Sequence, residues 1–138
     1  MIEKMFVRKV DCMEKISYVS LWVGKFSSIK ELENYLLIAY TEDGDAIPSQ
    51  FEKDFNIEYF DEDFSEAHYE DVEVHKLSQL LEGCSYDDVV IPNFVEKYGE
   101  VLPTNANSLI LLYDFEHTKS RDDDEIHCVK YVGSVQYE

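Results

Sequence analysis

The chain has 138 residues, of which 45% are hydrophobic and 14% aromatic, and it carries a formal net charge of −18 at pH 7. This length suits one domain, and the apolar content is too high for an intrinsically disordered chain. Charge of this sign repels nucleic acid and anionic membranes and attracts basic proteins, which argues strongly against direct binding to a DNA or RNA backbone.

The N-terminal third predicts a strand followed by a helix. Residues 18–24 alternate between two sets of side chains, one apolar and one more polar, which is typical of a strand. A helix is predicted from Ser28, an N-cap residue that forms a capping box with Glu31, and apolar residues recur at helical spacing as far as Tyr40. The single tryptophan, Trp22, lies on the more polar face of the strand. It is either an exposed anchor for a partner or a core residue beneath a helix, and the core position is favoured.

A turn, a short helix and a second strand are predicted next. Residues 41–46 form a turn built on an Asp-Gly-Asp sequence. Pro48 suits the first turn of a short helix, in which Phe51 and Phe55 share a face. Residues 57–60 have the composition of a strand.

Two helices are predicted in the middle of the chain. The first covers residues 74–82 and ends at Gly83. The second is opened by a capping box between Ser85 and Asp88, and Pro92 either kinks it or starts its second half. Both carry apolar residues at helical spacing, so both are expected to pack on a core.

The C-terminal part predicts two strands. A loop that contains Pro103 precedes residues 108–116, the clearest strand, whose apolar run suggests a central position in a sheet. A charged loop leads to a last strand, residues 126–137, and the two strands are expected to form a hairpin. The sum is an α+β fold, an antiparallel sheet of about four strands with helices packed over one face. We expect residues 1–138 to form a single domain, with residues 1–15 as a loosely ordered extension.

The sequence contains no recognisable catalytic motif. Its five glycines are too far apart for a glycine-rich phosphate loop, and neither GxSxG nor HExxH occurs. None of the ten lysines follows an acidic residue by two positions, a spacing that many nucleases use. We therefore predict that the protein is not an enzyme and has no catalytic residue and no cofactor.

Metal binding is the chemistry that the sequence comes closest to supporting. If residues 66–82 formed one helix, His68, Asp71 and His75 would share a face, as a transition-metal site requires. A solvated acidic face is the more common meaning of such a pattern. The acidic run at residues 122–125 is likewise more often a hydrated hairpin tip, so we predict no metal site.

Several features indicate a cytoplasmic protein. No stretch approaches the roughly 20 apolar residues that cross a bilayer, and charges interrupt the first fifteen residues, where a signal peptide would be apolar. Three cysteines at long spacings do not suggest a disulfide framework, so we expect reduced and partly buried thiols. The high charge favours a protein that is monomeric when free, and we expect binding to neither membranes nor nucleic acid.

The negative charge is concentrated in one quarter of the chain. Residues 41–75 hold thirteen acidic side chains against one basic side chain, Lys53. Aromatic residues are interleaved with these acids. In an interface with a basic partner, the acids would supply electrostatic attraction and the aromatic side chains would supply apolar contacts. We expect most of the phenylalanines to be core residues and a minority of the acids to contact the partner.

Four motifs follow one another between residues 18 and 70. They are Val19-Ser-Leu-Trp-Val-Gly-Lys-Phe26, Glu31-Leu-Glu-Asn-Tyr35, the Asp-Gly-Asp and Pro-Ser-x-Phe-x-x-Asp-Phe sequences of residues 40–55, and Tyr59-Phe-Asp-Glu-Asp-Phe64. In this order they resemble the immunity protein 22 family, and a looser similarity includes residues 109–115. The resemblance implies a small α+β protein without catalytic residues, encoded beside a toxin of a bacterial polymorphic toxin system and protecting the cell that produces it.

We therefore expect an immunity protein that binds and neutralises a cognate toxin, and a basic, nuclease-type toxin suits the charge of the chain. The residues expected to contact the toxin are acidic: Asp43, Asp45, Asp61, Glu62 and Asp63, with Asp122, Asp123 and Asp124 as further candidates. Two other hypotheses are open. One is an acidic DNA mimic or regulatory binding module without a toxin partner, and the other is a divalent-ion or enzymatic role centred on His68, Asp71 and His75.

Overall fold

The computed structural model describes residues 17–57, 60–115, 117, 125–126 and 128–137. Residues 1–15, expected to be a loosely ordered extension, lie outside this part of the chain. The helices are α1 (Ile29–Leu36), α2 (Gln50–Phe55), α3 (Leu77–Leu81) and α4 (Asp87–Tyr98), and η1 (Glu62–Phe64) is one turn of 3₁₀ helix. The strands are β1 (Tyr18–Gly24), β2 (Ala39–Tyr40), β3 (Ala46–Ile47), β4 (Ser65–Lys76), β5 (Val101–Tyr113), β6 (Glu125–Ile126) and β7 (Val129–Gln136).

An antiparallel sheet forms the centre of the molecule. Its strands lie in the order β4-β5-β1-β7-β6, and β2 pairs with β3 in a separate hairpin. The predicted α+β class and antiparallel sheet are confirmed, and the sheet has five strands where about four were expected. The strand predicted at residues 18–24 is β1.

The predicted hairpin between the last two long strands is wrong. β1 lies between β5 and β7 and pairs with both, so that Trp22 is opposite Ile110 on one side and Tyr131 on the other. The physical reason is that β1 is buried on both faces, which suits the central position of a covered sheet. β5 also begins earlier than predicted and includes Pro103, which was expected in a loop.

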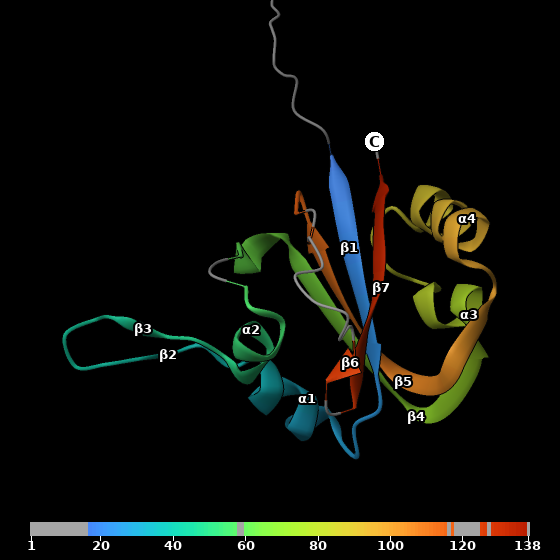
Figure 1. The fold of residues 1–138 in the computed structure, drawn as a ribbon. Coiled ribbons are helices and arrows are strands. Elements are labelled where there is room, and N and C mark those ends of the chain that lie inside the picture. Colours follow the sequence, from blue (N-terminus) through green and yellow to red (C-terminus); the bar gives the residue numbers. More distant parts are fainter. Residues whose placement is uncertain (1–16, 58–59, 116, 118–124, 127, 138) are drawn as a thin grey trace, which may run out of the picture.

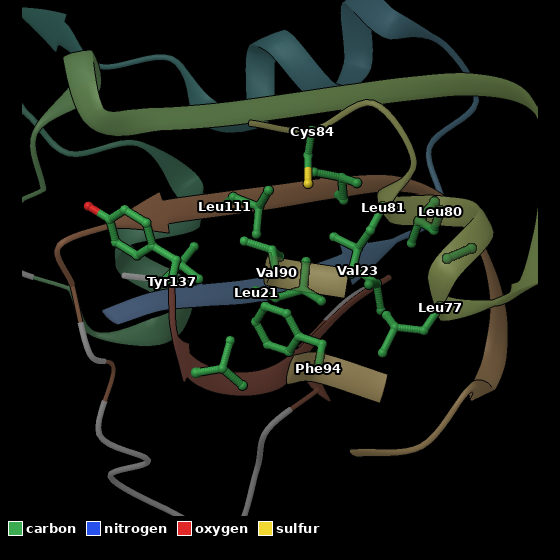
Figure 2. Packing of buried hydrophobic residues seen from close by; sticks show 14 of the residues in the cluster. Leu21, Val23, Leu77, Leu80, Leu81, Cys84, Val90, Phe94, Leu111 and Tyr137 are labelled. Atoms are coloured by element: carbon green, nitrogen blue, oxygen red, sulfur yellow. The ribbon is translucent and has the colours of Figure 1, made fainter. Parts of the chain in front are cut away.

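Helices cover both faces of the sheet rather than one (Figure 1). Side chains alternate between the faces of a strand, so neighbouring residues of β1 enter different cores. Leu21 and Val23 pack with α3 and α4, and Figure 2 shows them beside Val90 and Phe94 of α4. Trp22 points to the other face, where α1 and α2 close the second core.

Trp22 is fully buried in this second core. Its indole ring meets Phe51 edge-on, with 5.0 Å between the ring centroids, and Phe55 at 5.8 Å. The core interpretation of Trp22 is therefore confirmed, and the exposed-anchor interpretation is wrong. Phe51 and Phe55 share the buried face of α2, as their spacing predicted.

The predicted N-termini of the first two helices need small corrections. Ser28 caps α1 by accepting a hydrogen bond from the Glu31 N–H at 3.1 Å, but the Glu31 carboxylate binds the N–H of Ser27, so the capping box is incomplete. α1 ends at Leu36, and Tyr40 belongs to β2 instead. Pro48 precedes the N-cap of α2 and does not lie in its first turn.

Residues 65–76 form one long strand where a helix was expected from residue 74. β4 pairs with the outer edge of β5, and α3 begins only at Leu77. Such pairing overrides helical spacing when a neighbouring strand offers an open edge. The strand predicted at residues 57–60 is not found: Ile57 and Phe60 have no strand geometry, and residues 58–59 lie outside the described part.

The predicted capping box of α4 is also wrong. The helix begins at Asp87 after Tyr86, whose backbone is left-handed with φ 61° and whose side chain makes no cap. Ser85 binds across to β4 instead: its N–H and hydroxyl donate to the Glu66 carboxylate at 3.0 Å each. α4 continues through Pro92 to Tyr98.

Gly133 of β7 is a position where any larger residue meets α4. A Cβ atom there would lie 2.0 Å from the Cζ and Oη atoms of Tyr98. The Tyr98 hydroxyl accepts a hydrogen bond from the Ser134 N–H at 3.1 Å and lies 3.3 Å from the Ser134 carbonyl oxygen, to which it donates. Gly133→Ala should push the tyrosine ring away and lower the free energy of unfolding by about 1–3 kcal/mol, the value of these bonds.

Urea unfolding of Gly133→Ala, Tyr98→Ala and the double variant measures this effect. If the collision is the cause, the two substitutions are not additive, because the double variant has no ring to displace. Additive losses would contradict the steric explanation.

Candidate functional site

The β2–β3 hairpin extends away from the rest of the protein (Figure 1). Asp43 and Asp45 are exposed in its turn, which confirms the predicted Asp-Gly-Asp turn. Thr41 orders this turn: its N–H donates to the Asp45 carbonyl at 2.9 Å, and its hydroxyl accepts from the Asp45 N–H at 3.1 Å. Gly44, with φ +90°, supplies the left-handed residue that the turn requires. The tip therefore presents two carboxylates in a defined loop.

Asp61, Glu62 and Asp63 lie together in the connection between α2 and β4. All three are exposed, and Asp61 orders the segment by accepting a hydrogen bond from the Asp63 N–H at 2.9 Å. The Glu62 carbonyl accepts from the Ser65 hydroxyl at 2.8 Å. The backbone of η1 is thus held by local bonds, which fixes where its acidic side chains begin.

A groove of about 300 Å³ separates the base of the hairpin from η1. We call it the acidic groove. It is lined by Ile38, Tyr40, Ala46, Pro48, Glu52, Phe60, Asp61, Glu62 and Asp63. The structure therefore brings Asp61, Glu62 and Asp63 together with the hairpin, whereas Asp43 and Asp45 lie in the turn and do not line the groove.

The floor of the acidic groove is continuous with the second core. Phe60 is buried, and its ring lies 6.0 Å from that of Phe51. Phe60 and Glu62 also line a second hollow of about 210 Å³, which continues along β4 past Glu66 to Leu112 of β5. A partner in the acidic groove would thus meet a floor anchored in the core.

Large apolar side chains are exposed on the elements that border the acidic groove. Tyr40 of β2 is 62% exposed and Phe64 of η1 is 52% exposed, and Leu37 and Ile47 are also exposed. The other described phenylalanines are buried or half-buried, in line with the expectation that most are core residues. Aromatic and aliphatic residues beside charges are typical of protein interfaces.

Glu66, in the second hollow, is held as a carboxylate. Burial alone would raise its pKa, but hydrogen bonds from the Tyr113 hydroxyl at 2.6 Å and from Ser85, aided by His68, outweigh burial and hold the pKa below its ordinary value of 4.5. These bonds connect β4, β5 and the start of α4, so the ionised side chain stabilises this edge of the fold.

Low pH should therefore destabilise the packing of β4 against β5 and the start of α4. A group whose pKa is lowered in the folded state contributes stability above its unfolded pKa and loses it as the pH falls through the folded value. At pH 7, Tyr113→Phe should lower the free energy of unfolding by about 1.5 kcal/mol, typical of a hydrogen bond to a charged group. The difference from the unsubstituted protein should shrink as the pH falls below 4.5 and the Glu66 carboxylate becomes protonated. Urea unfolding across this range measures it, and a difference independent of pH would contradict the role of the ionised Glu66.

The titratable groups of the cores suit packing better than catalysis. Burial raises the pKa of the Cys84 thiol to about 12, which keeps it protonated and a poor nucleophile at neutral pH. Burial lowers the pKa of His117, whose ring lies 5.3 Å from that of Trp22 and 4.7 Å from that of Tyr131. Cys84 and Cys128 are free thiols; Cys84 is buried as expected, whereas Cys128 is exposed.

The metal site considered at His68, Asp71 and His75 is wrong. These residues lie on β4 and not on a helix, and a strand advances about 3.3 Å per residue, which separates the two histidines by on the order of 20 Å. Among the described residues, no group of three or more His, Cys, Asp or Glu side chains is placed to hold a metal ion. Asp122, Asp123 and Asp124 lie outside the described residues. Within the described part, no helix is long and apolar enough to cross a membrane.

Sequence reasoning missed Glu52 and Phe60 as lining residues of the acidic groove. Ser49 and Glu52 form a complete capping box at the start of α2, a pattern that is visible in the sequence and locates Glu52 in the first helical turn. Phe60 was assigned to a strand. That the hairpin faces η1 depends on tertiary packing, for which the sequence carries no local signal.

Comparison with known proteins identifies a family. A family model described as immunity protein 22 matches residues 19–138, which include the motifs of residues 19–64 and also the remainder of the chain. Neither a search of curated proteins nor a search of solved structures gives a significant match.

Proposed function

Because the chain belongs to the immunity protein 22 family, we propose that it binds a cognate bacterial toxin and neutralises it by covering the toxin's substrate-binding surface. The proposed toxin surface is basic, as the active site of a nuclease-type toxin would be. The toxin contacts the face formed by the β2–β3 hairpin and η1.

The observation that carries this proposal is the combination of charge and exposed apolar area around the acidic groove. Four of its lining residues are carboxylates, and Tyr40 and Phe64 are exposed on the elements beside it. Carboxylates attract a basic surface over a distance and speed its encounter. Aromatic residues supply the contact area that keeps the complex together once it has formed.

The toxin would be inhibited because this chain occupies its substrate-binding surface. A toxin that acts on nucleic acid needs a basic surface to hold phosphates, and the carboxylates of Asp43, Asp45, Asp61, Glu62 and Asp63 would take the place of these phosphates. The hairpin extends from the body of the protein, so it reaches into a concave surface without a clash from the sheet. Fast association protects the cell, because one free toxin molecule is enough to cause damage.

Co-expression with the product of the adjacent gene, which for an immunity protein should encode a toxin, tests the proposal. Cells should survive only when this chain is present, and the two proteins should co-purify as a stoichiometric complex. A toxic neighbour that the chain neither binds nor neutralises would contradict the proposal. Capture of a host nucleic-acid-binding protein in its place would support the alternative of an acidic DNA mimic.

A further inference from the structure

We propose that the acidic groove receives one cationic side chain of the toxin, an arginine or a lysine, and that Glu52 binds its charged group. This inference rests on the proposed function and deepens it, because it names the chemistry of a central contact.

Glu52 is an uncommon residue for a buried position. It is only 5% exposed, although a carboxylate is seldom buried without a partner. Its Oε1 atom accepts hydrogen bonds from the Ser49 N–H at 2.8 Å and from the Ser49 hydroxyl at 3.1 Å. Its Oε2 atom accepts none from the residues that the structure describes. This oxygen is not sealed from solvent, since the unpaired side-chain atom that is fully buried among the described residues is Nε1 of Trp22. Glu52 lines the acidic groove, so a donor can reach Oε2 from there.

The groove has the composition of a site for a long basic side chain. Ile38, Pro48 and Phe60 offer apolar walls to the methylene groups of lysine or arginine, and Tyr40 offers an aromatic ring to a cation. Asp61 and Asp63 add charge at the rim. A volume of about 300 Å³ lies at the lower end of the range for small-molecule sites, which suits one side chain.

Charge complementarity identifies the occupant as a cation. The lining residues include four carboxylates, Glu52, Asp61, Glu62 and Asp63, and among the described residues that line the groove there is no lysine or arginine. A cation that pairs with these carboxylates in a complex would therefore come from outside this set. The toxin, which the charge of the chain predicts to be basic, would supply it.

Glu52→Gln tests the inference with little change to the fold. Glutamine keeps an oxygen for the Ser49 bonds, since glutamine also completes a capping box, but it carries no charge. Glu31→Gln is the matched control: it removes the same charge from the same position in the first turn of α1. The Kd for the adjacent-gene toxin domain, measured by calorimetry, should rise at least 10-fold for Glu52→Gln and less than 3-fold for Glu31→Gln.

A second variant serves if Glu52→Gln fails to fold. Ala46→Arg places a guanidinium of the chain's own in the groove, from an exposed position on β3, and should also raise Kd at least 10-fold. Val72→Arg makes the same change of charge on β4, where the side chain is 69% exposed, and should leave Kd within 3-fold.

Two outcomes would overturn the inference, and they are distinguishable. Wild-type protein that binds tightly while Glu52→Gln and Ala46→Arg match their controls would overturn the role of the groove and leave the immunity function standing. Wild-type protein that does not bind the toxin at all would overturn the proposed function, and the inference with it.

Discussion

Trp22→Ala is expected to lower the free energy of unfolding by about 3–5 kcal/mol, the largest effect of any single substitution considered in this chain. The indole is fully buried between the central strand and α2, and its ring lies within 6 Å of those of Phe51, Phe55 and Tyr131. Removing it leaves a cavity that the surrounding aromatic rings cannot fill. Urea unfolding followed by circular dichroism measures the loss.

Trp22→Phe is the control for this prediction. It keeps an aromatic ring against Phe51 and removes the indole Nε1–H, which finds no hydrogen-bond acceptor among the described residues. Its cost should therefore stay below about 2 kcal/mol. If Trp22→Ala left stability unchanged and abolished toxin binding instead, Trp22 would be an anchor for the toxin and not a residue of the second core.

Reversing two charges at the rim of the acidic groove is expected to slow association with the toxin about 10-fold at low salt. Glu62→Lys with Asp63→Lys changes the charge facing a basic partner while it leaves Asp61, whose side chain holds η1, in place. Electrostatic steering acts mainly on the association rate, so the salt dependence of that rate should also flatten. Stopped-flow mixing at several salt concentrations measures both.

The matched control changes the same amount of charge on the opposite face. Glu82→Lys with Glu96→Lys substitutes exposed residues of the α3 and α4 side, where no toxin contact is proposed. This variant should associate at nearly the wild-type rate. Equal slowing by both pairs would show that net charge alone steers the partner and that the acidic groove has no special part.

Local signals predicted part of the local structure. The alternation of apolar and polar side chains predicted β1, and the Asp-Gly-Asp sequence predicted the turn between β2 and β3. The spacing of Phe51 and Phe55 predicted the buried face of α2. Pairing between distant segments was beyond these signals. β1 separates β5 from β7, and β4 is a strand because β5 offers it an open edge, although its residues near Val74 have helical spacing.

The candidate site was likewise predictable in part: its acidic residues could be named from the sequence, but their arrangement around a groove could not. Composition alone identified residues 41–75 as the charged segment and named Asp61, Glu62 and Asp63, which the structure places around one groove. Glu52 was accessible through its capping box with Ser49, but only the tertiary structure shows a buried carboxylate lining a groove. The metal hypothesis required a helix across residues 66–82. Residues 65–76 form a strand instead, so the hypothesis is wrong.

Hydrogen–deuterium exchange of the protein with and without the toxin domain would show whether the β2–β3 hairpin and η1 form the toxin-binding surface, since it locates the bound surface without substitutions. We expect slower exchange on binding in residues 38–48 and 60–67, which contain the hairpin and η1, and unchanged exchange in α4. Protection confined to α3 and α4, with the hairpin exchanging as in the free protein, would contradict this expectation.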